Sequence, residues 1–191
     1  MTIHLVPGRR YGYRTLLREI ARQLNIPITK AHEYINYLID TEQVEVSSWR
    51  GRRVYIPKSA ELTVFVYRVQ VAESWYTRKK TKGTPNPFAD FRVYVYTMRP
   101  EKYPESMLAS ILEDYRDRFF TSIKAAMQKE NIVYSSMSAL EIEKIDEDEM
   151  TIEGLGFVEM DHIYFYGAVY KEGAGIEYFA DVTAGEEPYR V

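Results

Sequence analysis

Residues 13–57 decide the fold of the N-terminal part, and they read YRTLLREIARQLNIPITKAHEYINYLIDTEQVEVSSWRGRRVYIP. In the first part of this stretch the apolar side chains recur every three to four residues, which is the period of a helix packed through one face. These inward residues are Leu16, Leu17, Ile20, Ala21 and Leu24. Asn25 and Pro27 are expected to end the helix, because the residue before a proline is disfavoured in the helical conformation.

A second helical pattern follows after a tight turn. Thr29 is its expected N-cap, because a threonine hydroxyl can accept a hydrogen bond from a free amide of the first turn. The residues expected to face the core are Ala31, Tyr34, Ile35, Leu38 and Ile39. Those expected to point away from it are Lys30, His32, Glu33, Asn36 and Tyr37.

A basic hairpin is predicted directly after the second helix. Apolar residues alternate with polar ones on both sides of Gly51, which indicates two half-buried strands. The alternating apolar residues are Val44, Val46, Val54 and Ile56. Gly51 permits a tight reversal between the strands. The reversal carries Trp49, Arg50, Arg52 and Arg53.

Two helices and a basic hairpin in this order resemble a winged helix-turn-helix domain over residues 11–57. The resemblance rests on IPITKAHEYINYLIDTEQVEV (26–46) and on WRGRR (49–53). It implies that the second helix enters the major groove of DNA and that the hairpin, or wing, contacts the backbone or the minor groove. The residues it places in the groove are Lys30, His32, Asn36 and Tyr37. The residues it assigns to the wing contact are Arg50, Arg52 and Arg53.

The chain departs from this family at its start. The family usually has another helix before these two, but residues 1–10 are short and contain Pro7 and Gly8. Ile3, Leu5 and Val6 predict a short strand instead. Either the missing helix comes from later in the chain or from a second subunit, or the domain is a minimal variant.

Residues 59–191 are expected to form a second domain after a first domain at 1–58, and the fold class is predicted as α+β. The pattern is ββαββββ, a mostly antiparallel sheet with one long helix near 104–129. That helix is expected to support the sheet, with a dimer seam as the alternative. The six strands are predicted at 61–72, 91–98, 139–145, 150–153, 162–170 and 176–182.

The segment 73–90 loses all periodicity and is predicted to be a basic loop. It contains Arg78, Lys79, Lys80 and Lys82, beside Trp75 and Tyr76. The loop is interpreted either as a solvated hairpin tip or as a DNA-binding arm that follows phosphates and stacks on bases.

The charge of the chain is unevenly distributed. Residues 1–58 carry 10 Lys and Arg against 5 Asp and Glu, and residues 59–100 carry 7 against 3. Residues 101–191 carry 8 against 20, so the first half is basic and the second acidic. This division favours polyanion binding by the N-terminal half.

The composition limits the class of protein. No apolar run approaches the length of a signal or transmembrane segment, so a soluble cytoplasmic protein without membrane contact is expected, in the host cell or virion if it is viral. The absence of cysteine excludes a disulfide scaffold and cysteine-based zinc sites. Eight Asn and Gln in all, no Cys and 17 Tyr are typical of a thermophile and similar to proteins of hot-acid archaea and their viruses.

The sequence offers no convincing catalytic motif. The histidines His4, His32 and His162 are isolated, and Glu143 and Lys144 are adjacent, so they face opposite sides of a strand. No glycine-rich phosphate loop has the required context. We therefore expect no enzyme activity, no metal and no cofactor.

These observations predict a protein that binds duplex DNA, a transcriptional regulator that forms a homodimer. The acidic domain is expected to dimerise, to bind a ligand or to recruit a protein partner. The alternative is a viral structural or assembly protein, in which the winged helix serves as a protein-interaction module. A nuclease with an unrecognised site is the third hypothesis.

Overall fold

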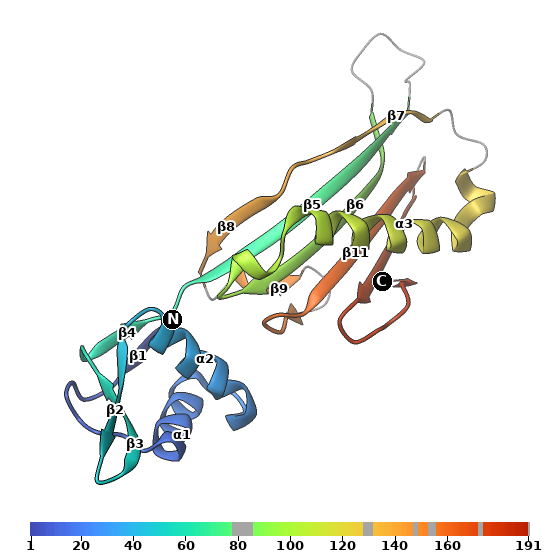
Figure 1. The fold of residues 1–191 in the computed structure, drawn as a ribbon. Coiled ribbons are helices and arrows are strands. Elements are labelled where there is room, and N and C mark those ends of the chain that lie inside the picture. Colours follow the sequence, from blue (N-terminus) through green and yellow to red (C-terminus); the bar gives the residue numbers. More distant parts are fainter. Residues whose placement is uncertain (78–85, 128–131, 147–148, 153–155, 172–173, 191) are drawn as a thin grey trace. The chain divides into compact units, whose positions relative to one another are not determined.

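The computed structural model describes residues 1–77, 86–127, 132–146, 149–152, 156–171 and 174–190. The chain divides into two compact units, Met1–Phe65 (unit 1) and Val66–Val191 (unit 2). The boundary falls later than residue 58, because strand β4 (Glu61–Thr63) pairs with β1 (Thr2–His4) and so belongs to the N-terminal unit (Figure 1). The fold is mixed α and β, as predicted.

Unit 1 is built on two helices, α1 (Tyr13–Leu24) and α2 (Ile28–Asp40). Both lie where the apolar periodicity predicted them, and their fully buried residues, such as Leu16 of α1 and Leu38 of α2, form the core between them. Asn25 ends α1 in the left-handed conformation, at φ 52°. The cap of α2 was predicted wrongly, because Pro27 precedes the helix and Thr29 lies inside its first turn.

The hairpin consists of β2 (Val44–Trp49) and β3 (Arg52–Pro57), paired antiparallel with Trp49 opposite Arg52. Arg50 and Gly51 form the two-residue turn, and both have positive φ angles, 51° and 72°. Positive φ at both positions is the geometry of a type I′ turn, which matches the twist of the two strands. The glycine meets this requirement without strain, whereas the arginine does not.

Residues 1–65 contain no helix besides α1 and α2, and all of them are described. The two-stranded ribbon of β1 and β4 is present instead, with Ile3 paired to Leu62 and both side chains fully buried. The predicted short strand at the start of the chain is thus confirmed, although it ends at His4.

Unit 2 is a seven-stranded antiparallel sheet in the order β13-β12-β11-β6-β5-β7, with β8 also paired to β5. A separate pair joins β9 (Thr151–Ile152) and β10 (Gly156–Phe157), and the short 3-10 helix η1 (Pro100–Lys102) precedes α3. The strands of the sheet are β5 (Val66–Thr77), β6 (Asn86–Thr97), β7 (Ile132–Met137), β8 (Glu141–Ile145), β11 (Ile163–Lys171), β12 (Ala174–Asp181) and β13 (Tyr189–Arg190).

Helix α3 (Glu105–Met127) lies across one face of this sheet (Figure 1). Its buried side chains contact the alternate residues of β5, β6 and β11 that point to the same face. The helix residues in this core are Leu108, Leu112, Tyr115 and Phe119. The long supporting helix is therefore confirmed. None of the helices in the described ranges is long and apolar enough to span a membrane.

The predicted basic loop at 73–90 is wrong at both ends. Strand β5 continues to Thr77 and β6 begins at Asn86, because the two strands pair with each other along this length. Trp75 packs against the core instead of projecting from a loop, with its ring 6.4 Å from that of Phe91. Tyr76 stacks on Tyr134 of β7, at 4.8 Å between ring centroids. Arg78, Lys79, Lys80 and Lys82 lie outside the described residues.

The predicted order ββαββββ is also incomplete. Strand β7 pairs with the far half of β5, and β13 pairs with β12, and neither strand was predicted. The expected strand 61–72 is in fact two strands, β4 in unit 1 and β5 in unit 2.

Candidate nucleic-acid interface

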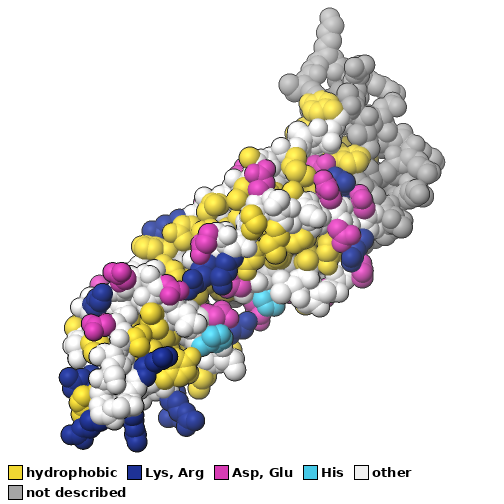
Figure 2. All heavy atoms as spheres, viewed as in Figure 1, with side chains coloured by type: hydrophobic (Ala, Val, Ile, Leu, Met, Phe, Trp, Pro, Cys, Tyr) yellow, Lys and Arg dark blue, Asp and Glu magenta, His cyan; other side chains and the backbone are white. Residues whose placement is uncertain are grey.

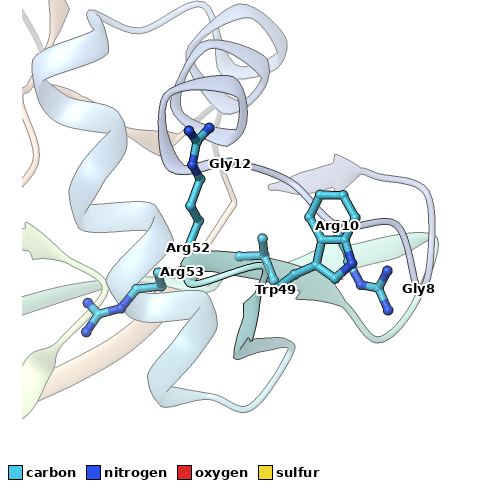
Figure 3. Close-up of a pocket in the computed structure, with 7 residues that line it drawn as sticks. Gly8, Arg10, Gly12, Trp49, Arg52 and Arg53 are labelled. Atoms are coloured by element: carbon cyan, nitrogen blue, oxygen red, sulfur yellow. The ribbon is translucent and has the colours of Figure 1, made fainter.

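An open hollow lies at the turn end of the β2–β3 hairpin (Figure 3). Its volume is about 620 Å³, and it is lined by Gly8, Arg10, Gly12, Trp49, Arg52, Arg53 and Val54. The segment before α1 forms one side and the hairpin forms the other. Trp49 remains 43% exposed although it is the largest side chain there. An exposed indole is free to contact a ligand by packing or stacking.

Two guanidinium groups lie over the Trp49 ring. Arg50 lies 4.4 Å from the ring centroid, and Arg10 lies 5.6 Å from it. The neighbouring Arg9 lies 5.2 Å from the centroid of the Tyr11 ring. The cation–π contact between Arg10 and Trp49 joins the segment before α1 to the hairpin. We call Arg9, Arg10, Trp49, Arg50, Arg52 and Arg53 together the hairpin surface.

All five arginines of the hairpin surface are exposed. Among the residues that the structure describes, none of the five has a carboxylate within ion-pairing distance. Arg22 of α1 is different, because it pairs with Glu19 at 2.6 Å. The hydrogen bond from Arg22, followed by that from Gln23, lowers the pKa of Glu19. Figure 2 shows Lys and Arg side chains gathered on unit 1.

The start of α1 adds positive potential to the same place. Gly12 is its N-cap, no side chain caps the helix, and its first turn contains no acidic residue. The free amides at a helix start carry partial positive charge. Figure 3 shows Arg52 reaching from β3 toward Gly12, while Arg53 points in another direction.

The outer face of α2 has a different character from the hairpin surface. Lys30 is half-buried, and His32 Nδ1 lies 2.5 Å from the Thr29 carbonyl oxygen of its own helix. Asn36 is exposed. Tyr37 was predicted wrongly as a groove residue, because its side chain is only 9% exposed and its hydroxyl accepts a hydrogen bond from the Phe65 amide at 3.5 Å.

Carboxylates flank the one exposed amide of this face. Glu33 precedes Asn36 by three residues and Asp40 follows it by four, and side chains at these spacings are neighbours on a helix. Hence Asn36, one of the predicted groove residues, lies between two acidic side chains. The structure places Arg50, Arg52 and Arg53 together, but it does not place Lys30, His32 and Asn36 among them.

Arg9, Arg10 and Trp49 were not among the predicted contacts. The signal for the first two was the Arg-Arg pair immediately before α1. The position of this pair beside β3 depends on the backbone bridge between Tyr11 and Tyr55. In this bridge each amide donates to the other residue's carbonyl at 2.9 Å. That pairing joins residues far apart in the sequence, so local patterns did not reveal it.

A second polar cluster lies in unit 2. His162 Nδ1 lies 2.8 Å from Asp181, and its Nε2 lies 2.9 Å from Glu159. The adjacent Asp161 instead accepts hydrogen bonds from the hydroxyls of Thr97 at 2.6 Å and Tyr103 at 2.9 Å. Within the described ranges, no three His, Asp or Glu side chains are arranged to hold a metal ion. These contacts tie strand ends together, and we assign the cluster a structural role.

Comparison of the chain with models of protein families, with curated proteins and with solved structures finds no match.

Proposed function

We propose that unit 1 is a winged-helix-type module that binds duplex DNA, and that the protein acts as a transcriptional regulator. The observation that carries this proposal is the hairpin surface, where five arginines have no carboxylate partner among the described residues and two of them, Arg10 and Arg50, lie over the exposed indole of Trp49. Guanidinium groups bind phosphate oxygens with a planar, forked geometry. A set of unneutralised arginines on one surface is the electrostatic pattern of a nucleic-acid-binding protein.

The arrangement of elements supports the same proposal. Two helices followed by a two-stranded hairpin is the order of a winged helix, with the basic turn in the position of the wing. Five arginines held without neutralising partners repel one another, and binding to a polyanion removes that cost.

The proposal is tested by fluorescence anisotropy of a labelled random duplex titrated with the full chain over a salt series. If all five arginines neutralise phosphates, the logarithm of the binding constant should fall with the logarithm of salt with a slope of about 4.5. Arg10→Ala and Arg52→Ala should each lower this slope by about 0.9.

Arg22→Ala is the matched control, because it removes an equal charge from a side chain that is 71% exposed but already paired with Glu19. Its slope should equal that of the original chain. Absence of binding even at low salt would refute the proposal and favour the assembly role, and the oligomeric state would then be measured next.

A further inference from the structure

We propose that the DNA backbone crosses the hairpin surface and that the outer face of α2, formed by Glu33, Asn36 and Asp40, is turned away from the DNA. This inference rests on the proposed function and specifies its docking face. It assigns most of the binding to the segment before α1 and to the hairpin, not to the helix that the resemblance places in the major groove.

The hairpin surface and the outer face of α2 differ in charge. The hairpin surface has five positive charges with no carboxylate partner among the described residues. The outer face of α2 has two carboxylates; Glu33 Oε1 lies 4.0 Å from Nε2 of His32, and the cation beside the face, Lys30, is half-buried. A helix in the major groove lies between two rows of phosphates, so carboxylates on its outer face are repelled from both sides.

The outer face of α2 has few side chains available for reading bases. Of the four residues placed in the groove by the resemblance, Tyr37 is buried and His32 contacts the carbonyl of Thr29. Asn36 is the remaining exposed amide, and Glu33 and Asp40 are its neighbours on the helix. The face therefore offers one base-reading group in an acidic setting.

The guanidinium groups around the hollow diverge. Figure 3 shows Arg10, Arg52 and Arg53 pointing in three different directions around the hollow. Groups that converge would suit a single concentrated anion, whereas groups that diverge suit phosphates spaced along a strand. Trp49 lies among them with 43% of its surface exposed, so a nucleic-acid backbone in the hollow also covers the indole.

The test begins with the double variant Glu33→Gln/Asp40→Asn, which removes both carboxylates and keeps the size of the side chains. At about 0.1 M salt the Debye length is about 10 Å, so charges turned away from the DNA are largely screened. We expect the affinity of this variant to stay within about twofold of the original, while Arg10→Ala/Arg52→Ala loses more than about tenfold. A several-fold gain for the double variant would overturn the inference, because it would place α2 against the phosphates.

The absence of cysteine from the chain permits a second, direct measurement. Asn36→Cys places a single thiol on the outer face of α2, and Ser48→Cys places one on the exposed part of β2 beside Trp49. Bound duplex should slow maleimide labelling of the thiol at position 48 and leave the thiol at position 36 unchanged. Protection of position 36, or protection of neither position, would overturn the docking face.

The two proposals fail in different ways. If the original chain binds no duplex at any salt concentration, the proposed function is wrong. If it binds and the changes on α2 alter affinity or labelling, only the docking face is wrong. Circular dichroism of each variant separates lost contacts from lost folding.

Discussion

At the scale of single residues, Arg50 combines a strained backbone with a proposed contact to DNA. Its φ of 51° lies in the left-handed region, which costs a non-glycine residue about 1 kcal/mol or more. Asparagine tolerates this region, and Asn-Gly is the preferred pair for this turn. Arg50→Asn should therefore relieve about 1 kcal/mol of backbone strain and lose a cation–π contact with Trp49 worth about 0.5 kcal/mol. The net effect is a free energy of unfolding that is higher by about 0.5 kcal/mol. Urea denaturation measures the change, and anisotropy should show weaker DNA binding.

Arg50→Ala is the matched comparison for this prediction. Alanine removes the same charge and the same contact with Trp49, but it keeps the unfavourable left-handed backbone. Both variants should lose DNA affinity equally, while only the alanine variant loses stability. Equal stabilities would show that the turn stores no strain at this position.

At the scale of elements, a buried ion pair links α3 to the sheet in addition to their shared hydrophobic core. Arg116 Nη1 donates to both carboxylate oxygens of Glu73 on β5, at 3.0 and 2.8 Å. The side chains are 18% and 7% exposed. Arg116 also pairs with the exposed Asp117 at 3.2 Å, so Glu73→Gln leaves its charge partly compensated. The substitution should lower the free energy of unfolding by about 2 kcal/mol in urea denaturation.

The same substitution at Glu141 provides the control for the ion pair. Glu141 is exposed on β8 and accepts a hydrogen bond from Gln70 at 2.5 Å, so Glu141→Gln should cost less than about 0.5 kcal/mol. Similar losses at both positions would mean that the contact between α3 and β5 does not depend on the charge of Glu73.

The elements also show which parts of the fold the sequence could predict. Helices α1, α2 and α3 and the β2–β3 hairpin were predictable because their periodicity and turn residues are local. The ends of β5 and β6 were not, because residues 73–77 become strand by pairing with β6 and β7. At the candidate interface, the wing arginines were predictable from the turn at Gly51, whereas the contact of the Tyr37 hydroxyl with the amide of Phe65 joins residues far apart in the sequence.

At the scale of the whole molecule, the two units carry opposite charges. Residues 1–65 have 10 Lys and Arg against 6 Asp and Glu, whereas residues 66–191 have 15 against 22. At about 0.01 M salt the Debye length is about 30 Å, so the acidic unit should repel DNA even without touching it. We therefore expect the fragment Met1–Phe65 to bind random duplex several-fold more tightly than the full chain at this salt concentration.

The salt dependence decides between this explanation and a direct effect of unit 2 on the interface. Long-range repulsion is screened at about 0.15 M salt, where the Debye length is about 8 Å, so fragment and full chain should then bind alike. A difference that persists at this salt concentration would contradict simple repulsion. The fragment contains its own core, with Ile3, Leu16, Ile20, Leu38 and Leu62 fully buried, and a cooperative thermal transition in circular dichroism must accompany the binding measurement.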